Sequence, residues 1–504
     1  MNTGKPISYS ARIAALAAEH PHDVALVVAP ANALDFTVTW QMLDTHATVW
    51  ANNLAARGVD RHWAVVIALP NGVEHVFASI AAWRLGALVV VISSQTPPPE
   101  RAQYLEAVAS SGRPIAVFSM AGVAAEGFGI DIHPSDLDVP WDTAIRPDVI
   151  AHPGRTVATG GTTGRPKIVV DVNPWVYGGA SAMSRAVGYD PGDTVLVCGP
   201  LYHGAPALLL NFALLNDSKV VLMERFDASR AVRLIHAHSI QFVFFVPTQM
   251  KRVIELPNLT RDRFDSVKIL YHTAAFCPPA LKRHWIEFLG ARRVVELYGA
   301  NDGLGFTVIG GEEWLARPGS VGRPVGCEIC ILDEKGEPVE TGSIGLVYLR
   351  PASAPGAAPV DSASVYAFLG AERHANKMGG FETVGDLGYV DDDGFLYLVD
   401  RRVDMIVSGG ANVYPAEVEG VLAEHASVQD VAVIGLPDAE WGRKVHAIIL
   451  LKPGADSSVA PSLDALVRSR LAPYKVPKTY EFVTEFARNE AGKLQRQKMV
   501  LARS

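Results

Sequence analysis

Residues 159–167 read Thr-Gly-Gly-Thr-Thr-Gly-Arg-Pro-Lys, so three glycines, three threonines and two cations stand in nine residues. The apolar stretches 156–158 and 168–170 on either side are patterned as strands, which predicts a glycine-rich turn between two strands. Backbone N–H groups of such a turn can surround an anion, because glycine adopts positive φ without a steric penalty. A Gly- and Thr-rich turn alone leaves a phosphate-binding loop and a solvated polar hairpin both open. It is not a Walker A loop, since no Gly-x-x-x-x-Gly-Lys-Ser/Thr occurs.

The full string resembles the phosphate-loop signature Thr-Ser-Gly-Thr-Thr-Gly-x-Pro-Lys of the adenylate-forming superfamily, which includes acyl-CoA synthetases, luciferases and peptide-synthetase adenylation domains. Gly160 stands where the family has Ser, which removes one hydroxyl from the phosphate site. The resemblance implies that Thr163 is catalytic. It also implies that this loop binds nucleotide through Thr159, Gly160, Gly161, Thr162, Thr163, Gly164 and Lys167.

The composition is that of an ordinary globular protein. The chain has 504 residues, of which 49% are hydrophobic and 19% charged, and its length indicates two to four domains or one large multilobed domain. The net charge is −8 and no long basic run occurs, which argues against nucleic acid as a partner.

The cysteines and the length of the apolar runs indicate the cellular compartment in which the protein is expected. Cys327 and Cys330 have a metal-like spacing, but a second pair is absent and the segment is patterned as a strand. We therefore expect these two, with Cys198 and Cys277, to be buried free thiols rather than zinc ligands. No apolar run reaches 18 residues and no signal pattern opens the chain, which predicts a soluble cytoplasmic protein without a membrane span.

Hydrophobic periodicity predicts alternating helices and strands. Helices are expected over 9–19, 40–58 and 73–85, with buried strands over 63–69 and 87–92. Further strands are expected over 194–198, 219–223, 241–246, 267–271 and 293–297, and helices over 205–215, 227–238, 247–255 and 278–288. This alternation predicts α/β sheets that are mostly parallel and covered on both faces.

Short strands separated by Gly, Pro and Asp turns predict a small β-barrel over about 320–400. The resemblance implies an N-terminal AMP-binding domain over 1–400, containing the two sheets and the barrel. A mobile C-terminal α+β lid over 401–504 would follow a hinge at 400–404. Val403 stands where the family hinge carries Asp or Lys.

The stretch 200–204, Pro-Leu-Tyr-His-Gly, follows a predicted strand and resembles the family's Pro-Leu-aromatic-His motif. This implies that His203 orients the acyl carboxylate. It also implies an acyl pocket lined by Tyr202, His203, Gly204 and Gly303. Because small residues gather there without a cation, we expect an apolar, bulky or ring-bearing acid.

Two further strand ends resemble the family's adenine motifs. Residues 273–275 match Gly-Ala-Ala with Thr in the first place, which implies that Ala274 and Ala275 border the adenine. Residues 295–302 resemble Tyr-Gly-x-Thr-Glu, which implies nucleotide contacts from Glu296, Leu297, Tyr298, Gly299, Ala300 and Asn301. Asp302 replaces the family's Glu as the Mg²⁺ ligand, with a carboxylate set back by about 1 Å.

The remaining motifs resemble the ribose, CoA and lysine sites. Residues 383–386 match Thr-Gly-Asp, so that Asp386 and Arg401 would bind the ribose. Ser408, Gly409 and Gly410 would border the pantetheine tunnel, and Trp441 would stack on the CoA adenine. Residues 489–493 resemble Pro-x-x-x-Gly-Lys, which implies that Lys493 is the catalytic adenylation lysine.

The mechanism implied by the resemblance uses ATP or an acyl-AMP, CoA and Mg²⁺. A carboxylate attacks the α-phosphate of ATP, and the CoA thiol then displaces AMP after the lid turns. The departures at Gly160, Asn301 and Asp302 all fall at the phosphate site, whereas the CoA-facing loop keeps the family pattern.

We therefore expect a complete acyl-CoA ligase with a weakened phosphate site. Three alternatives stay open: an enzyme of the thioester half that takes acyl-adenylate from a partner adenylating enzyme, an acyl-AMP ligase that loads a carrier protein, and a non-catalytic acyl-nucleotide binding protein. A homodimer is also left open.

Overall fold

The computed structural model describes residues 7–120, 125, 127–160, 166–179, 181–300, 303–333, 335–353, 360, 365–370, 380–401, 404–408, 411–438, 441–471, 475–488 and 494–503. Within these ranges the predicted helices and strands of the α/β part are confirmed to within a few residues. No helix among the described residues has the length and apolar character needed to cross a membrane.

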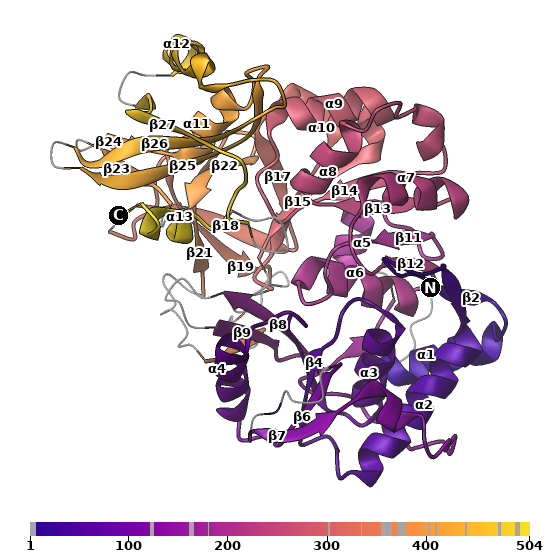
Figure 1. Ribbon diagram of the computed structural model, residues 1–504. Coiled ribbons are helices and arrows are strands. Elements are labelled where there is room, and N and C mark those ends of the chain that lie inside the picture. Colours follow the sequence, from indigo (N-terminus) through magenta and orange to yellow (C-terminus); the bar gives the residue numbers. More distant parts are fainter. Residues whose placement is uncertain are drawn as a thin grey trace.

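The first sheet has the order β20-β9-β8-β5-β4-β6-β7, and all of its strands except β20 lie in the purple part of Figure 1. Five neighbouring strands are parallel: β8 (Arg155–Gly160), β5 (Leu88–Val91), β4 (Ala64–Ala68), β6 (Ile115–Ser119) and β7 (Gly129–Ile132). The antiparallel strands β9 (Pro166–Asp171) and β20 (Tyr366–Leu369) complete one edge. Helices α2 (Trp40–Ala56) and α3 (Val73–Arg84) cover one face, and α4 (Pro98–Ala109) covers the other.

The second sheet has six adjacent parallel strands: β2 (Val24–Ala29), β12 (Val220–Met223), β11 (Val195–Val197), β13 (Phe242–Phe245), β14 (Ile269–His272) and β15 (Val294–Gly299). The antiparallel β3 (Phe36–Thr39) lies at one edge. Helices α1 (Tyr9–Glu19) and α6 (Gly204–Leu215) cover the face toward the first sheet. The opposite face is covered by α7 (Ala228–Ala237), α8 (Pro247–Ile254), α9 (Pro279–Leu289) and α10 (Gly311–Ala316). These strands read as continuous apolar runs because both faces of the sheet are buried.

The strand-rich region continues the second sheet. From β15 the order runs through β16 (Phe306–Gly310), β17 (Ser320–Val325), β22 (Leu396–Arg401), β21 (Glu382–Val390), β19 (Gly345–Pro351) and β18 (Cys327–Leu332). Short strands occur over about 320–400, the region predicted as a small β-barrel; β16 and β17 join them to the α/β part, and β20 from the same region pairs with β9 of the first sheet. The pairing partner of a strand depends on long-range contacts that the hydrophobic pattern does not encode.

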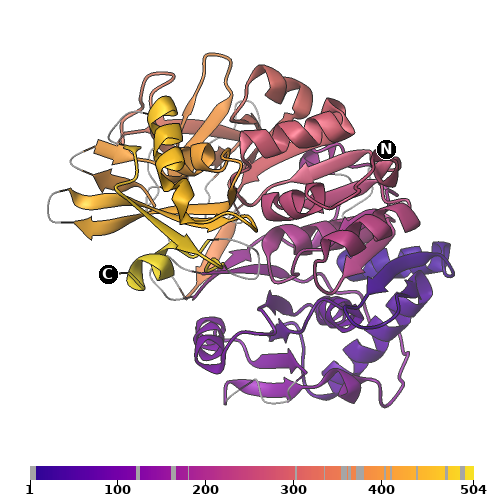
Figure 2. The ribbon, with the colours of Figure 1, turned by 45° about the horizontal axis from the view of Figure 1, so that its top comes forward.

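The C-terminal part has its own sheet of β25 (Val428–Asp438), β26 (Gly442–Leu451) and β27 (Thr479–Val483). It also contains the hairpin β23 (Ile406–Ser408) with β24 (Ala411–Val413) and the helices α11 (Pro415–Leu422), α12 (Ala460–Arg470) and α13 (Arg496–Leu501). These elements form a separate apolar core. Figure 2 shows this orange-to-yellow part beside the second sheet. Met405 and Tyr414 pack against the apolar side chains of β18, β19 and β21.

Smaller elements complete the fold: β1 (Ile7–Ser8) pairs with β10 (Val176–Tyr177), and α5 (Ala182–Ala186) is a short helix. The four cysteines are free, and Cys198, Cys277 and Cys327 are buried as expected, whereas Cys330 is half-buried on β18. Among the described residues no group of three or more His, Cys, Asp or Glu side chains could hold a metal ion.

Candidate active site

The predicted phosphate loop lies in a β-hairpin. Strands β8 and β9 are antiparallel, with Thr159 opposite Lys167 and Gly160 opposite Pro166, so the two predicted strands on either side of the turn are confirmed. The Lys167 ammonium lies 3.5 Å from the centre of the Phe368 ring on β20, a cation–π contact at the base of the turn. The turn itself, with Gly161, Thr162, Thr163 and Gly164, falls outside the described residues.

The residues 202–204, predicted to line the acyl pocket, follow the carboxyl end of β11, where ligand sites of parallel sheets gather. His203 is the N-cap residue of α6, with Gly204 at the first helical position, and the rings of Tyr202 and His203 lie 4.3 Å apart. Gly303 has a φ of +69°, and a Cβ there would lie 3.2 Å from Val365. A larger residue at 303 would therefore be strained as well as crowded.

Asn71, which sequence reasoning missed, holds this acyl segment. Its side-chain amide donates to the carbonyls of Gly199 (2.9 Å) and Met223 (3.1 Å), and its carbonyl accepts from the N–H of Leu201 (2.8 Å). Asn71 follows β4 of the first sheet, so it ties the two sheets together beside His203. The turn-like Pro70-Asn71-Gly72 after a buried strand is the sequence signal that could have found it.

The residues predicted to border the adenine lie at the ends of β14 and β15. Ala274 has a φ of +76°, a left-handed conformation that is costly for a residue with a Cβ, and both Ala274 and Ala275 are exposed. Tyr298, at the end of β15, donates a hydrogen bond of 2.7 Å from its hydroxyl to Asp386 on β21. The predicted adenine and ribose residues are thereby brought together.

The other residues of this stretch divide between core and site. Leu297 is buried in the core between the two sheets, Gly299 ends β15 and Ala300 follows it. Glu296 is buried and accepts a hydrogen bond of 2.6 Å from Lys282 of α9. Asn301 and the predicted Mg²⁺ ligand Asp302 lie outside the described residues. Backbone pairing places Arg401 opposite Asp386.

The residues predicted to border CoA lie in the C-terminal part. Ser408 is buried at the end of β23 and pairs with Ala411 across the hairpin whose turn, Gly409 and Gly410, lies outside the described residues. The backbone N–H of Trp441 donates to the Asp438 carboxylate (3.1 Å), and the Lys478 ammonium lies 4.4 Å from the centre of the Trp441 ring. Lys493 also lies outside the described residues.

Comparisons with known proteins identify the family of the chain. A model of the AMP-binding enzyme family matches residues 13–113 and 155–354, and a model of the AMP-binding enzyme C-terminal domain matches 417–493. The 2-succinylbenzoate–CoA ligase of Bacillus licheniformis is 29% identical over 473 residues, which cover 92% of this chain and 95% of the relative. The long-chain-fatty-acid–CoA ligase FadD13 of Mycobacterium tuberculosis is 28% identical over 484 residues, covering 91% and 92%.

Among solved structures, o-succinylbenzoate CoA synthetase of Bacillus subtilis in complex with its acyl-adenylate intermediate matches with a TM-score of 0.82 at 27% sequence identity, over 98% of each chain. The same enzyme with ATP and magnesium ion matches with a TM-score of 0.80 at 25% identity, over 98% of this chain and 99% of that one. The chain therefore belongs to the AMP-binding enzyme family, on the acyl-CoA ligase branch of the adenylate-forming superfamily.

Proposed function

We propose that the protein is an acyl-CoA ligase that converts a hydrophobic carboxylic acid, magnesium-bound ATP and CoA into acyl-CoA, AMP and pyrophosphate. The proposal rests on how much of this chain the family models and the named relatives match. Family models match both the N-terminal and the C-terminal part, and relatives named as CoA ligases align over more than nine-tenths of this chain.

In the first proposed step, the carboxylate of the substrate acid must approach the negatively charged phosphates of ATP. Thr163 and Lys167 of the phosphate loop and Lys493 of the lid would screen that repulsion as negative charge develops at the α-phosphate. His203 would orient the carboxylate, and Asp386 would accept the ribose hydroxyls. Magnesium enters with ATP and neutralises phosphate charge, and Asp302 is the residue proposed to hold it.

The thioester half of the reaction is proposed to use the C-terminal part as a lid that turns about residues 400–404. Its separate apolar core supports movement as a unit, since its internal packing need not change. The turn would withdraw Lys493 and bring the hairpin of Ser408, Gly409 and Gly410 to the adenylate, where the CoA thiol attacks the acyl carbon and AMP leaves. Trp441 is proposed to stack on the CoA adenine.

The relatives favour a complete ligase over the thioester-only and carrier-protein alternatives, because those aligned over most of the chain are named as CoA ligases. We propose a ring-bearing or long apolar acid as the substrate. The support is the set of small residues at Gly204 and Gly303, together with aromatic and long-chain acids in the names of relatives. The free cysteines are compatible with a location in the reducing environment of the cytoplasm.

Mass spectrometry of products tests this function. A panel of aromatic, long-chain, short-chain and amino acids is incubated with magnesium, ATP and CoA, and in parallel the matching synthetic acyl-adenylates are supplied without ATP. We expect acyl-CoA from apolar acids in both arms. Thioester from the adenylates alone would replace the proposal with the thioester-only enzyme, and product from acetate or amino acids alone would overturn the substrate class.

A further inference from the structure

The segment proposed to border the adenine is a loop closed at its base by one carboxylate. This adenine loop, residues 273–278, connects β14 to α9. His272 is the last residue of β14, and Lys282 lies in the first turn of α9, where its N–H donates to the carbonyl of Pro278. Both side chains meet Glu296 of β15: the Lys282 ammonium lies 2.6 Å and the His272 Nε2 lies 4.0 Å from the same oxygen, Oε2.

This cluster is enclosed in the protein. Lys282 and His272 have no exposed surface, and Glu296 is 8% exposed. Burial lowers the pKa of His272 well below its usual value, so its ring is neutral, and neither ring nitrogen has a hydrogen-bond partner among the described residues. Burial raises the pKa of Glu296, and the Lys282 ammonium opposes that rise. Lys282 is thus the cation that pairs with this carboxylate.

A buried ion pair of this kind contributes little to the net stability of a fold. Removing two charges from water costs several kcal/mol per ion, and well-packed apolar residues of similar volume often serve a core equally well. An ion pair differs from apolar packing in fixing direction and distance. In this protein the ion pair fixes the distance between the start of α9 and β15. That distance sets the width of the adenine loop at its base.

The cluster is connected to the proposed nucleotide contacts on both sides. On one side, His272 and Lys282 flank the loop that carries Ala274 in its strained left-handed conformation. On the other side, Glu296 lies two residues before Tyr298 on β15, so both side chains leave the same face of the strand. Glu296 therefore links the strand that carries Tyr298 to the helix that begins directly after the loop.

We infer that Glu296, held by Lys282, is a positioning residue that sets the width of the adenine site between the loop 273–278 and Tyr298. The inference rests on the proposed function for the identity of the nucleotide. It assigns Glu296 a role through the protein rather than by contact with the base, because the oxygen Oε2 is already engaged by Lys282.

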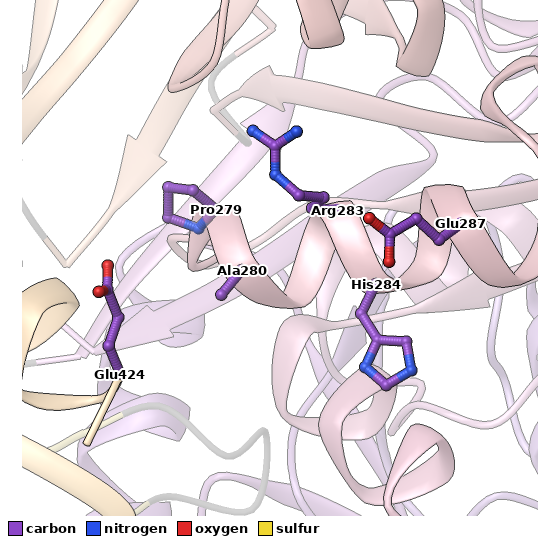
Figure 3. Close-up of a pocket in the computed structure, with 6 residues that line it drawn as sticks. All are labelled: Pro279, Ala280, Arg283, His284, Glu287 and Glu424. Atoms are coloured by element: carbon purple, nitrogen blue, oxygen red, sulfur yellow. The ribbon is translucent and has the colours of Figure 1, made fainter. Parts of the chain in front are cut away.

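A matched control for this inference lies one residue along the chain. Arg283 also carries a positive charge on α9, but it lines an open groove of about 440 Å³ that reaches Glu424 of the C-terminal part. Figure 3 shows Arg283, His284 and Glu287 projecting from this helix. Arg283→Met removes the same charge from the same helix without touching Glu296.

The test compares Lys282→Met, Glu296→Gln, the double variant Lys282→Met/Glu296→Met and Arg283→Met. Calorimetric affinity for AMP, KM for ATP, KM for the acid and the melting temperature are measured for each. We expect the single variants to weaken AMP binding about tenfold or more, as misplacement by a fraction of an ångström does. The double variant should regain thermal stability while AMP binding and KM for ATP stay impaired and KM for the acid is unchanged. Arg283→Met should match the wild type.

Recovery of both stability and AMP affinity in the double variant would overturn the inference, since the pair would then only fill space. Should the double variant not fold, unchanged AMP affinity in folded Glu296→Gln would overturn it as well. Failure of the wild-type protein to bind AMP or ATP would instead reject the proposed function, and this inference with it.

Discussion

The hydroxyl of Tyr298 donates a hydrogen bond of 2.7 Å to the buried carboxylate of Asp386, which joins the α/β part of the second sheet to its antiparallel extension. One residue is proposed to stack on adenine and the other to accept the ribose hydroxyls. Removing the Tyr298 hydroxyl should therefore misorient the ribose acceptor while leaving the aromatic ring in place.

Tyr298→Phe is predicted to raise KM for ATP about tenfold, since a hydrogen bond to a charged group contributes about 1.5 kcal/mol. Steady-state kinetics with ATP varied at saturating acid and CoA measures this. Tyr397→Phe is the matched control, because it removes a tyrosine–aspartate bond (3.2 Å to Asp391) on the neighbouring strand β22. Equal effects of the two substitutions on KM for ATP would contradict the prediction.

Asn71→Ala is predicted to lower kcat/KM for the acid on the order of 10- to 100-fold with little change in KM for ATP. The substitution leaves the carbonyls of Gly199 and Met223 and the N–H of Leu201 without this partner, so the segment that carries His203 loses its anchor. Varying acid and ATP separately in steady-state assays distinguishes the two effects.

Asn53→Ala is the control for Asn71→Ala. Asn53 is also buried and donates to the carbonyls of Leu137 (2.8 Å) and Pro140 (2.9 Å), away from the strand ends of the site. The Asn53→Ala variant should have a lower melting temperature and an unchanged kcat/KM for the acid per folded molecule. If Asn71→Ala lost stability and kept wild-type kinetics, its proposed role beside His203 would be wrong.

His75 on α3 gives a prediction about pH. It lines an enclosed cavity of about 30 Å³ beside Gly204, and burial lowers its pKa to about 4. The pKa of His75 in the folded chain lies below its value of about 6.5 in the unfolded chain. Between these two pH values the unfolded chain therefore binds a proton at His75 and the folded chain does not. Stability from neutral His75 is therefore present above pH 6.5 and is lost as the pH falls toward 4.

Urea unfolding at pH 7 and pH 4.5 measures this loss against His75→Gln, whose side chain does not titrate. The wild type should lose about 2 to 3 kcal/mol more than the variant between these two values. Identical pH dependence of the two proteins would show that folding does not lower the pKa of His75.

Gly305→Ala is predicted to destabilise the fold by about 1 to 3 kcal/mol. Gly305 has a φ of +149°, and a Cβ there would lie 2.2 Å from the Cβ of Cys327. Gly305 immediately precedes β16, and Gly310→Ala at the other end of that strand would meet nothing within 4 Å and should change the melting temperature little. Similar melting temperatures for both variants would contradict the described approach of β18 to Gly305.

The regular elements were predictable from sequence because each rests on local periodicity. The strand 241–246 and the helix 278–288 illustrate this, since their apolar residues recur with periods that the structure keeps as β13 and α9. The meeting of several motifs at strand ends was also predictable, because parallel strands present their carboxyl ends at one edge.

The long-range polar contacts were not predictable in the same way. Lys282 in a helix sequence next to Arg283 is typical of a solvated face, and its burial against Glu296 depends on how α9 lies on the sheet. Asn71 stands 128 and 152 residues from the carbonyls that it binds. The course of the strands over 320–400 likewise depends on pairings between distant segments.

The central claim, that this chain itself forms an acyl-adenylate from ATP, is tested most directly by ATP–pyrophosphate exchange. The wild-type protein with an acid that yields acyl-CoA should incorporate labelled pyrophosphate into ATP without CoA, and Lys493→Ala should abolish the incorporation. Thioester formation from synthetic adenylate with no exchange from any such acid would contradict the account.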